Sequence, residues 1–396
     1  MPPARHHGLD FLRATMMLLG VVLHIAASYV AAPADGGWPL RDPNGTALAG
    51  PIALGIHVFR MPAFFFLSGF FGALVVARRG LRAWLADRLL RIAFPMVMAW
   101  IVLFPITKLA FTYAIGRALE ATGNARASTE LIGTALAQSW ANPSPMHLWF
   151  LLYLLALCLL AGVLSKASRI APLGLRAFIV RAPATCLGGW REPFLLAALA
   201  LAALLPMLAM PGPGIATPSS FAIQPSVLLC YGVYFFGGWI LALNPHPTAA
   251  LLRGARRRLA LGSALLLVSI ALAIAWFVLA ASPTNASRPA IRLVFVLGQA
   301  SQALSAWLLI LGASGLAERA IRTPNRLIRT MVDSSYWVYL VHLPICVFVT
   351  GQLIPWSAPG ALKLLVAIAI SLVLLALGFG ATMLVLPRRA NPPMPG

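Results

Sequence analysis

The chain has 396 residues, of which 60% are hydrophobic and only 10% are charged, and its mean hydropathy is +0.87. Soluble domains carry about a quarter charged residues, so this composition excludes a water-soluble globular protein. The formal net charge of +21 does not require a nucleic-acid partner, because Lys and Arg collect in the cytoplasmic loops of membrane proteins. The four cysteines are far apart and show neither metal-ligand spacing nor a disulfide framework. We therefore expect a membrane protein with no nucleic-acid partner and no metal site.

Apolar runs long enough to cross a bilayer recur along the chain. A hydrocarbon core of about 30 Å requires about 20 apolar residues in a helix. On this basis we predict ten transmembrane helices, at residues 11–32, 51–76, 92–113, 147–164, 193–210, 225–243, 259–281, 291–313, 335–354 and 362–386. The expected fold class is all-α, a polytopic integral membrane protein. It has a single transmembrane domain over residues 8–387 and a short tail over 388–396.

The distribution of basic residues predicts the orientation of these helices. Most of the 30 Lys and Arg residues lie at the two ends of the chain and in alternate loops. The positive-inside rule makes that side cytoplasmic. We therefore expect a multi-pass protein of the cell (inner or plasma) membrane with both termini and the tail in the cytoplasm. The first span has the basic start of a signal peptide, but its apolar stretch is too long for one, so we expect it to remain uncleaved.

Three ionisable residues are predicted to lie deep in the outer half of the bilayer. An ionisable residue inside a span is costly, and is therefore a functional candidate by default. At 1.5 Å per residue, His24 lies roughly 20 Å above the cytoplasmic face, while His57 and Arg60 lie roughly 9 and 14 Å below the outer face. The three can share one level and form the candidate catalytic group. The alternative for His24 is a purely structural role.

A second group of charged residues is predicted at the cytoplasmic face. Asp10 and Arg13 are three residues apart and can pair locally. Arg13 and His24 are eleven residues apart, so they face the same direction with roughly 16 Å between them along the helix. Arg88 and Arg91 end a basic loop where the third span begins. These arginines form either an anion site or only a marker of topology.

Two further residues flank the start of the ninth span, namely Asp333 and His342. We place His342 roughly 10 Å inside the bilayer, where it serves either the site or only a hydrogen bond to a neighbouring helix. His147, at the mouth of the fourth span, is expected to be interfacial. No acidic residue occurs deep in any predicted span, so the sequence offers no carboxylate to orient His24.

These residues belong to a series of motifs. In chain order they are GLDFLRA at 8–14 followed by His24, RMP at 60–62, FFFLSGF at 64–70, RLLR at 88–91 with Pro95, HLWFL at 147–151 and SYWVYLVH at 335–342. Their order resembles the membrane-bound acyltransferase 3 family, whose first span carries a basic residue, ten intervening residues and a histidine. The second- and fourth-span motifs lean toward its glucans biosynthesis protein C subgroup, which succinylates periplasmic glucans.

The resemblance implies an acyl-CoA-dependent O-acyltransferase. An acetyl or succinyl group would pass from cytoplasmic acyl-CoA to a hydroxyl of an extracytoplasmic carbohydrate, such as a periplasmic glucan or a surface polysaccharide. Acyl-CoA is then a co-substrate, and no bound cofactor is expected. Its phosphates suit Arg13, Arg88 and Arg91, and a pantetheine arm of roughly 15–20 Å would carry the thioester to His24.

At the level of His24, two chemical routes are open. The imidazole acts either as a general base on the sugar hydroxyl or as a nucleophile that is acylated first. Arg60 or His57 could stabilise the oxyanion. The other candidates are Asp10, Ser68, Asp333 and His342.

Two other classes of function compete with this one. In a transporter, the intramembrane His and Arg residues would line a substrate path, but the sequence shows no inverted repeat. A membrane scaffold without chemistry of its own would lose no activity when His24 is replaced.

Overall fold

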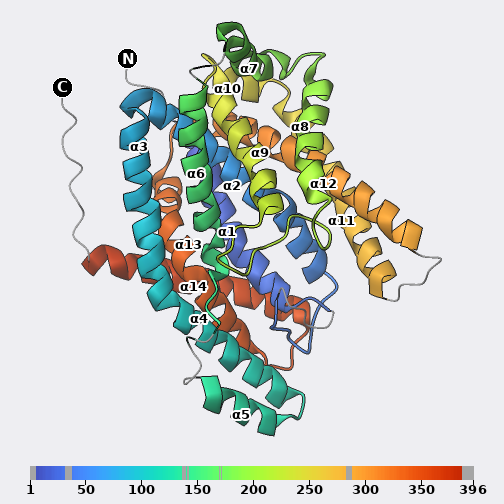
Figure 1. The fold of residues 1–396 in the computed structure, drawn as a ribbon. Coiled ribbons are helices and arrows are strands. Elements are labelled where there is room, and N and C mark those ends of the chain that lie inside the picture. Colours follow the sequence, from blue (N-terminus) through green and yellow to red (C-terminus); the bar gives the residue numbers. More distant parts are fainter. Residues whose placement is uncertain are drawn as a thin grey trace. The chain divides into compact units, whose positions relative to one another are not determined.

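The computed structural model describes residues 6–385 apart from 32–37, 136–139, 141, 169, 171 and 282–287, and it is built from helices (Figure 1). In chain order these are α1 (His7–Ser28), α2 (Ala49–Arg79), α3 (Leu81–Arg88), η1 (Leu89–Ala93), α4 (Phe94–Ala121), α5 (Ala125–Ala135), η2 (Met146–Leu148), α6 (Trp149–Ala167), α7 (Leu173–Cys186), α8 (Glu192–Met207), α9 (Pro225–Ala242), α10 (Pro247–Leu252), α11 (Ala255–Ala281), α12 (Arg288–Ala320), α13 (Arg326–Leu353) and α14 (Gly360–Val385). Within the described residues there is no β-strand, so the all-α class is confirmed. The predicted tail, residues 388–396, lies outside them.

Among the described residues, nine helices are long and apolar enough to cross a membrane. They correspond to nine of the ten predicted spans. The exception is the predicted span 193–210, whose helix α8 has 16 residues and ends at Met207. The chain there turns into a Pro-Gly-Pro-Gly segment, and proline and glycine both end helices.

The third span differs from the prediction at its start. Helix α3, the π-helical turn η1 and helix α4 follow one another without a break, so the apolar helical run covers Leu81–Ala121. Arg88 and Arg91 therefore lie inside a helix, whereas the sequence placed them at the end of a loop. After α4, part of the stretch 114–146 between the third and fourth predicted spans forms helix α5.

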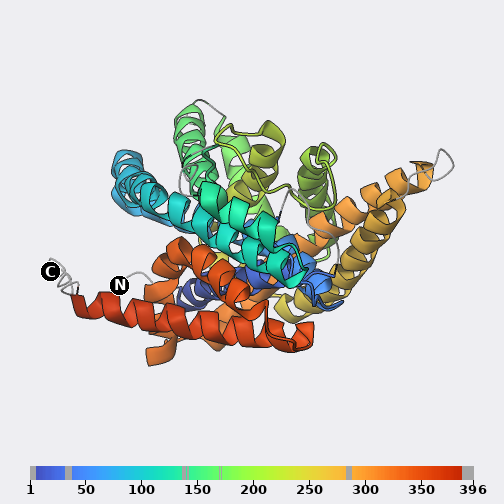
Figure 2. The same ribbon diagram turned by 90° about the horizontal axis from the view of Figure 1, so that it is seen from below.

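The helices fall into two units, and each is described by itself. Unit 1 comprises the described parts of residues 1–19, 51–104 and 140–332. In it α11 and α12 pack along one another as a long hairpin (Figures 1 and 2). Helices α2 and α9 approach closely at Gly69 and Gly238, where an added Cβ would collide with the backbone of the facing helix. Small residues at a crossing allow this close packing in membranes, which explains the glycine of the second-span motif.

Unit 2 comprises the described parts of residues 20–50, 105–139 and 333–396. Figure 2 shows α14 running alongside the residues of α13 that belong to this unit. The two helices meet where the Trp337 indole lies over Gly378, whose added Cβ would be 2.7 Å from that ring. Gly351 likewise packs on Ala114 of α4. These contacts join the end of α4 to α13, and α13 to α14, in the core of unit 2.

Candidate functional site

His24 lies near the end of α1, in unit 2, and contacts two other rings. The Trp38 indole stacks on its imidazole, with ring centroids 5.2 Å apart and planes inclined by 21°. The imidazole of His342, from α13, also has its centroid 5.2 Å away, with planes inclined by 39°. His24 is half-buried, whereas His342 is 1% exposed. The fold therefore brings together two candidate histidines from opposite ends of the sequence.

The backbone holds His342 in one tautomer. Its Nδ1 atom lies 2.8 Å from the carbonyl oxygen of Tyr339 and 3.1 Å from that of Val338. Carbonyl oxygens only accept hydrogen bonds, so Nδ1 carries the hydrogen and Nε2 is the basic nitrogen of the neutral ring. These carbonyls orient the imidazole as a carboxylate orients the histidine of a catalytic triad.

The segment that carries Trp38 is itself fixed to the end of α1. We call it the α1–α2 strap (residues 38–46). The Trp38 Nε1 donates to the Ser28 hydroxyl at 2.8 Å, and the Arg41 Nη1 donates to the Ala27 carbonyl at 2.8 Å. The last carbonyls of a helix lack intrahelical partners, and the strap supplies one. The indole is thereby held over the candidate imidazole.

A buried ion pair joins the strap to α14. The Lys363 Nζ lies 2.5 Å from the Asp42 Oδ2, and both side chains are fully buried. The same Nζ donates to the Ile354 carbonyl at 3.2 Å. Desolvation offsets much of the attraction in such a pair, so its main effect is to hold the strap in one position.

In unit 1, His57 and Arg60 are both bound to backbone carbonyls. The Arg60 Nε donates to the Met16 carbonyl at 2.8 Å, and the guanidinium of Arg60 lies 5.7 Å from the centroid of the Phe64 ring. The His57 Nε2 lies 2.9 Å from the carbonyl oxygen of Ile215 and donates to it. Arg60 is 6% exposed. Their predicted part in stabilising an oxyanion stays a prediction.

A buried amide cluster beside His57 was not found by sequence reasoning. The Gln299 Oε1 accepts from the Gly214 N–H at 2.8 Å, and its Nε2 donates to the Met207 carbonyl at 2.9 Å. Gly214 has φ +90°, and a Cβ there would lie 3.3 Å from Gln302 and 3.4 Å from His57, so the position favours glycine. The sequence does contain a signal for this cluster. Gln299 and Gln302 stand three residues apart in a predicted span, and buried amides need hydrogen-bond partners.

At the start of α1, the predicted local pair between Asp10 and Arg13 is present. The Arg13 Nη2 lies 3.4 Å from the Asp10 Oδ1. The guanidinium also lies 5.7 Å from the centroid of the Phe71 ring, and its side chain is 38% exposed. A carboxylate and an aromatic face thus orient this arginine while part of it stays accessible.

Arg88 and Arg91 share a carboxylate that the sequence analysis did not single out. The Asp87 carboxylate lies 2.7 Å from the Arg88 Nη2 and 2.6 Å from the Arg91 Nε. The Arg91 side chain is 73% exposed. Arg91 lies in the π-helical turn η1, and such turns are frequent at functional sites. The sequence spacing could have predicted this ion pair, because side chains four residues apart on a helix, such as Asp87 and Arg91, are neighbours.

The other predicted residues differ in how far they are exposed. Asp333 is exposed on α13, Ser68 is half-buried on α2, and His147, expected to be interfacial, is buried in η2. His57 and Arg60 belong to unit 1 and His24 to unit 2, so the level that they were predicted to share stays a prediction.

A second buried ion pair joins α8 to α11 in unit 1. The Arg258 guanidinium donates to the Glu192 carboxylate at 3.0 and 3.2 Å, and the Gly188 N–H donates to it at 2.5 Å. Burial alone would raise the pKa of Glu192, but these hydrogen bonds and the charges of Arg258 and Arg257 lower it below its ordinary value. Arg258 is therefore a buried structural residue of the first turn of α11.

Comparison with known proteins identifies the family. The acyltransferase domain of the acyltransferase 3 family matches residues 6–385. The glucans biosynthesis protein C of Escherichia coli strain K12 is 30% identical to this chain over 169 residues, which is 43% of this chain and 41% of that protein. The proteins of the same name from strains SMS-3-5 and O1:K1 have the same identity and coverage. The aligned part thus covers about two fifths of these relatives. No solved structure matches. With a domain match over nearly its whole length and its series of long apolar helices, the chain belongs to the acyltransferase 3 family of multi-pass membrane acyltransferases.

Proposed function

We propose that the protein transfers an acetyl or succinyl group from acyl-CoA to a carbohydrate hydroxyl, with His24 at the reacting atoms. The observation that carries the proposal is the contact between His24 and His342. An acyl transfer to a hydroxyl needs a base near neutral pH, and imidazole is the side chain best suited to that task. His342 supports the assignment because its tautomer is set by two carbonyls.

In the direct route, the acceptor hydroxyl attacks the thioester carbonyl carbon while the His24 imidazole takes its proton. The carbon–sulfur bond then breaks, and the imidazolium returns that proton to the leaving CoA thiolate. The products are the carbohydrate ester and the free CoA thiol. Neutral His342 can accept an N–H hydrogen bond at Nε2, which would strengthen a neighbouring imidazole as a base. The alternative route, in which His24 is acylated first, uses the same residues.

The donor's phosphates would bind at Arg13, Arg88 and Arg91. Guanidinium groups form paired, charge-assisted hydrogen bonds with phosphate oxygens. The carboxylates of Asp10 and Asp87 would hold these side chains in place before the donor arrives. Arg13 and His24 lie on the one helix α1, eleven residues apart, and the corresponding length of roughly 16 Å suits an extended pantetheine arm.

The proposed acceptor is an extracytoplasmic glucan or related polysaccharide, and the proposed location is the cell (inner or plasma) membrane. The name of the glucans biosynthesis protein C relatives and the basic residues of alternate loops support this part. The donor would then enter from the cytoplasm and the acceptor from outside.

Sealed vesicles of known orientation test the proposal. Acyl-CoA is supplied on the Arg-rich side and glucan on the other, and the ester is followed by mass spectrometry, which also identifies the acyl group. We expect the ester only in the glucan compartment. An ester that forms only when donor and glucan share a compartment would refute transfer across the bilayer. Intact substrate crossing without ester would point to a transporter instead.

A further inference from the structure

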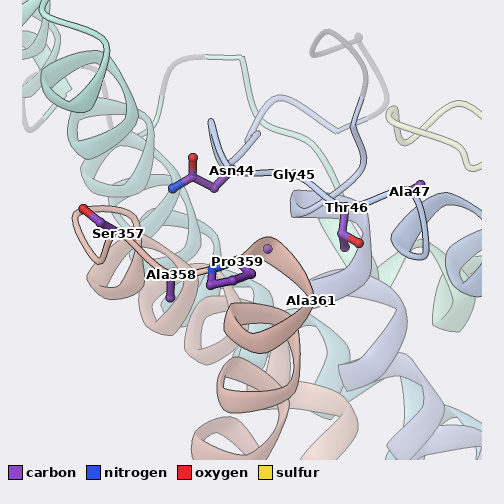
Figure 3. Close-up of a pocket in the computed structure, with 9 residues that line it drawn as sticks. Asn44, Gly45, Thr46, Ala47, Ser357, Ala358, Pro359 and Ala361 are labelled. Carbon is purple, nitrogen blue, oxygen red and sulfur yellow. The ribbon is translucent and has the colours of Figure 1, made fainter.

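A pocket of about 780 Å³ lies in unit 2, and neither His24 nor His342 is among its lining residues (Figure 3). Its lining comes from two short segments, the end of the strap with the residues that follow it and the turn between α13 and α14. The lining residues are Asn44, Gly45, Thr46, Ala47, Ser357, Ala358, Pro359, Gly360 and Ala361. The pocket is an open depression rather than an enclosed cavity.

The lining of this pocket is polar but uncharged. Asn44 contributes an amide, and Thr46 and Ser357 contribute hydroxyls, while the other lining residues are small or proline. Figure 3 shows these side chains on the two facing segments. Amides and hydroxyls donate and accept hydrogen bonds without carrying charge. Such a lining suits a neutral polyhydroxylated ligand better than a phosphate or a carboxylate.

The charged residues two positions from the lining segments, Asp42 and Lys363, are bound to each other. Lys363, in the first turn of α14, is fully buried and bound to the equally buried Asp42. The Lys363 Nζ also donates to the Ile354 carbonyl. Lys363 is therefore not available as a cation to a ligand in the pocket, which agrees with the uncharged lining.

The pocket is formed by fixed backbone. An added Cβ at Gly360 would collide with the carbonyl oxygens of Asn44 and Gly45, so the two segments are in direct contact. The Asn44 N–H donates to Asp42 at 2.8 Å, and the Thr46 N–H donates to the Tyr29 carbonyl at 2.8 Å. A preformed pocket loses less entropy when it binds a ligand than a mobile loop does.

The strap that lines the pocket with Asn44 and Thr46 also holds Trp38 on His24. We propose that the pocket binds a neutral sugar segment of the acceptor other than the sugar that is acylated. This inference rests on the proposed function and deepens it by naming a subsite. One rigid segment would then link acceptor binding to the candidate base.

The test measures binding without acyl-CoA. The full-length protein in detergent micelles is titrated with neutral α- and β-linked glucose hexasaccharides, separately, and followed by saturation-transfer NMR. We expect one of them to bind, and Asn44→Ala and Ser357→Ala each to weaken binding by about 3- to 10-fold through loss of one neutral hydrogen bond. Ala47→Trp should fill the pocket and remove binding while leaving every hydrogen bond of the strap in place. The control Ser220→Ala, an exposed serine of unit 1, should bind as the wild type does.

A hexauronate of the same length, with a carboxylate on each ring, should bind at least several-fold more weakly. The proposal is overturned if neither hexasaccharide binds, if the pocket variants bind like the wild type, or if the hexauronate binds as well. Because no donor is present, a failure of acyl transfer in vesicles would not change these readings. Equally, a failure in the pocket would leave the acyl transfer itself untouched.

Discussion

The imidazoles of His24 and His342 lie with their centroids 5.2 Å apart, and the second is fixed by two backbone carbonyls. The sequence shows no carboxylate deep in a span that could orient His24. A second histidine, itself oriented by the backbone, gives the site a different means of setting a basic nitrogen. This arrangement leads to the first prediction.

Replacing His24 with Ala should abolish acyl transfer, and His342→Gln should lower kcat by about 10- to 100-fold. Removal of a general base costs about 10²- to 10⁴-fold, and loss of a positioning residue costs less.

If the two histidines act as a unit, the double variant should be no slower than His24→Ala. His246→Gln, an exposed histidine, serves as the control and should retain full activity. Unchanged transfer in His24→Ala, with normal expression, would remove this residue from the mechanism.

The arginine cluster gives a prediction about the donor. Arg91→Ala and Asp87→Asn should both raise the KM for acyl-CoA, the first by about 10- to 150-fold, since a hydrogen bond to a charged group contributes about 1.5–3 kcal/mol. The KM for the glucan should change little. Arg126→Ala removes an arginine that is 94% exposed and four residues from Glu130, so it should leave both constants as they are. If Arg91→Ala also leaves the donor KM unchanged, this arginine marks topology only.

The buried pair of Asp42 and Lys363 predicts an asymmetry in stability. Lys363→Met should destabilise the protein by about 3–5 kcal/mol, because it leaves a buried carboxylate without its partner. Adding Asp42→Asn should recover a large part of that loss. The measurement is thermal unfolding in micelles, with Arg117→Ala as a surface-pair control expected to cost at most about 1 kcal/mol. A double variant as unstable as Lys363→Met would argue against the desolvated charge as the cause.

Glu192 predicts a dependence of stability on acid. Its pKa is lowered in the folded state, so its pairing stabilises the fold above the unfolded-state pKa, and this contribution is lost as the pH falls through the folded-state pKa. Glu192→Gln should therefore melt below the wild type at pH 7, and the difference in Tm should shrink as the pH falls below about 4. Glu130→Gln, whose side chain is 73% exposed, should show no such trend. A Tm difference that is constant with pH would show that the Glu192 charge is not the cause.

Much of the fold could be predicted from the sequence. Long apolar runs require helices in a bilayer, because only internal hydrogen bonds satisfy the backbone there, so the spans and the all-α class followed from composition. The local pair of Asp10 and Arg13 followed from helical spacing alone. The ends of the helices were predicted less well, as the start of α3 and the short α8 show. Proline and charged residues mark the end of a helix only approximately.

Contacts between distant segments were decided by the tertiary structure. Nothing in the spacing of the chain indicates that Trp38 stacks on His24, that His342 lies beside the same ring, or that Lys363 reaches Asp42. Each contact depends on how α13, α14 and the strap pack around the end of α1. Periodicity specifies which residues share one helix face, whereas the choice of partner across helices depends on packing that a single sequence does not encode locally. The residue types of the candidate site were therefore legible in the sequence, and their arrangement was set by the fold.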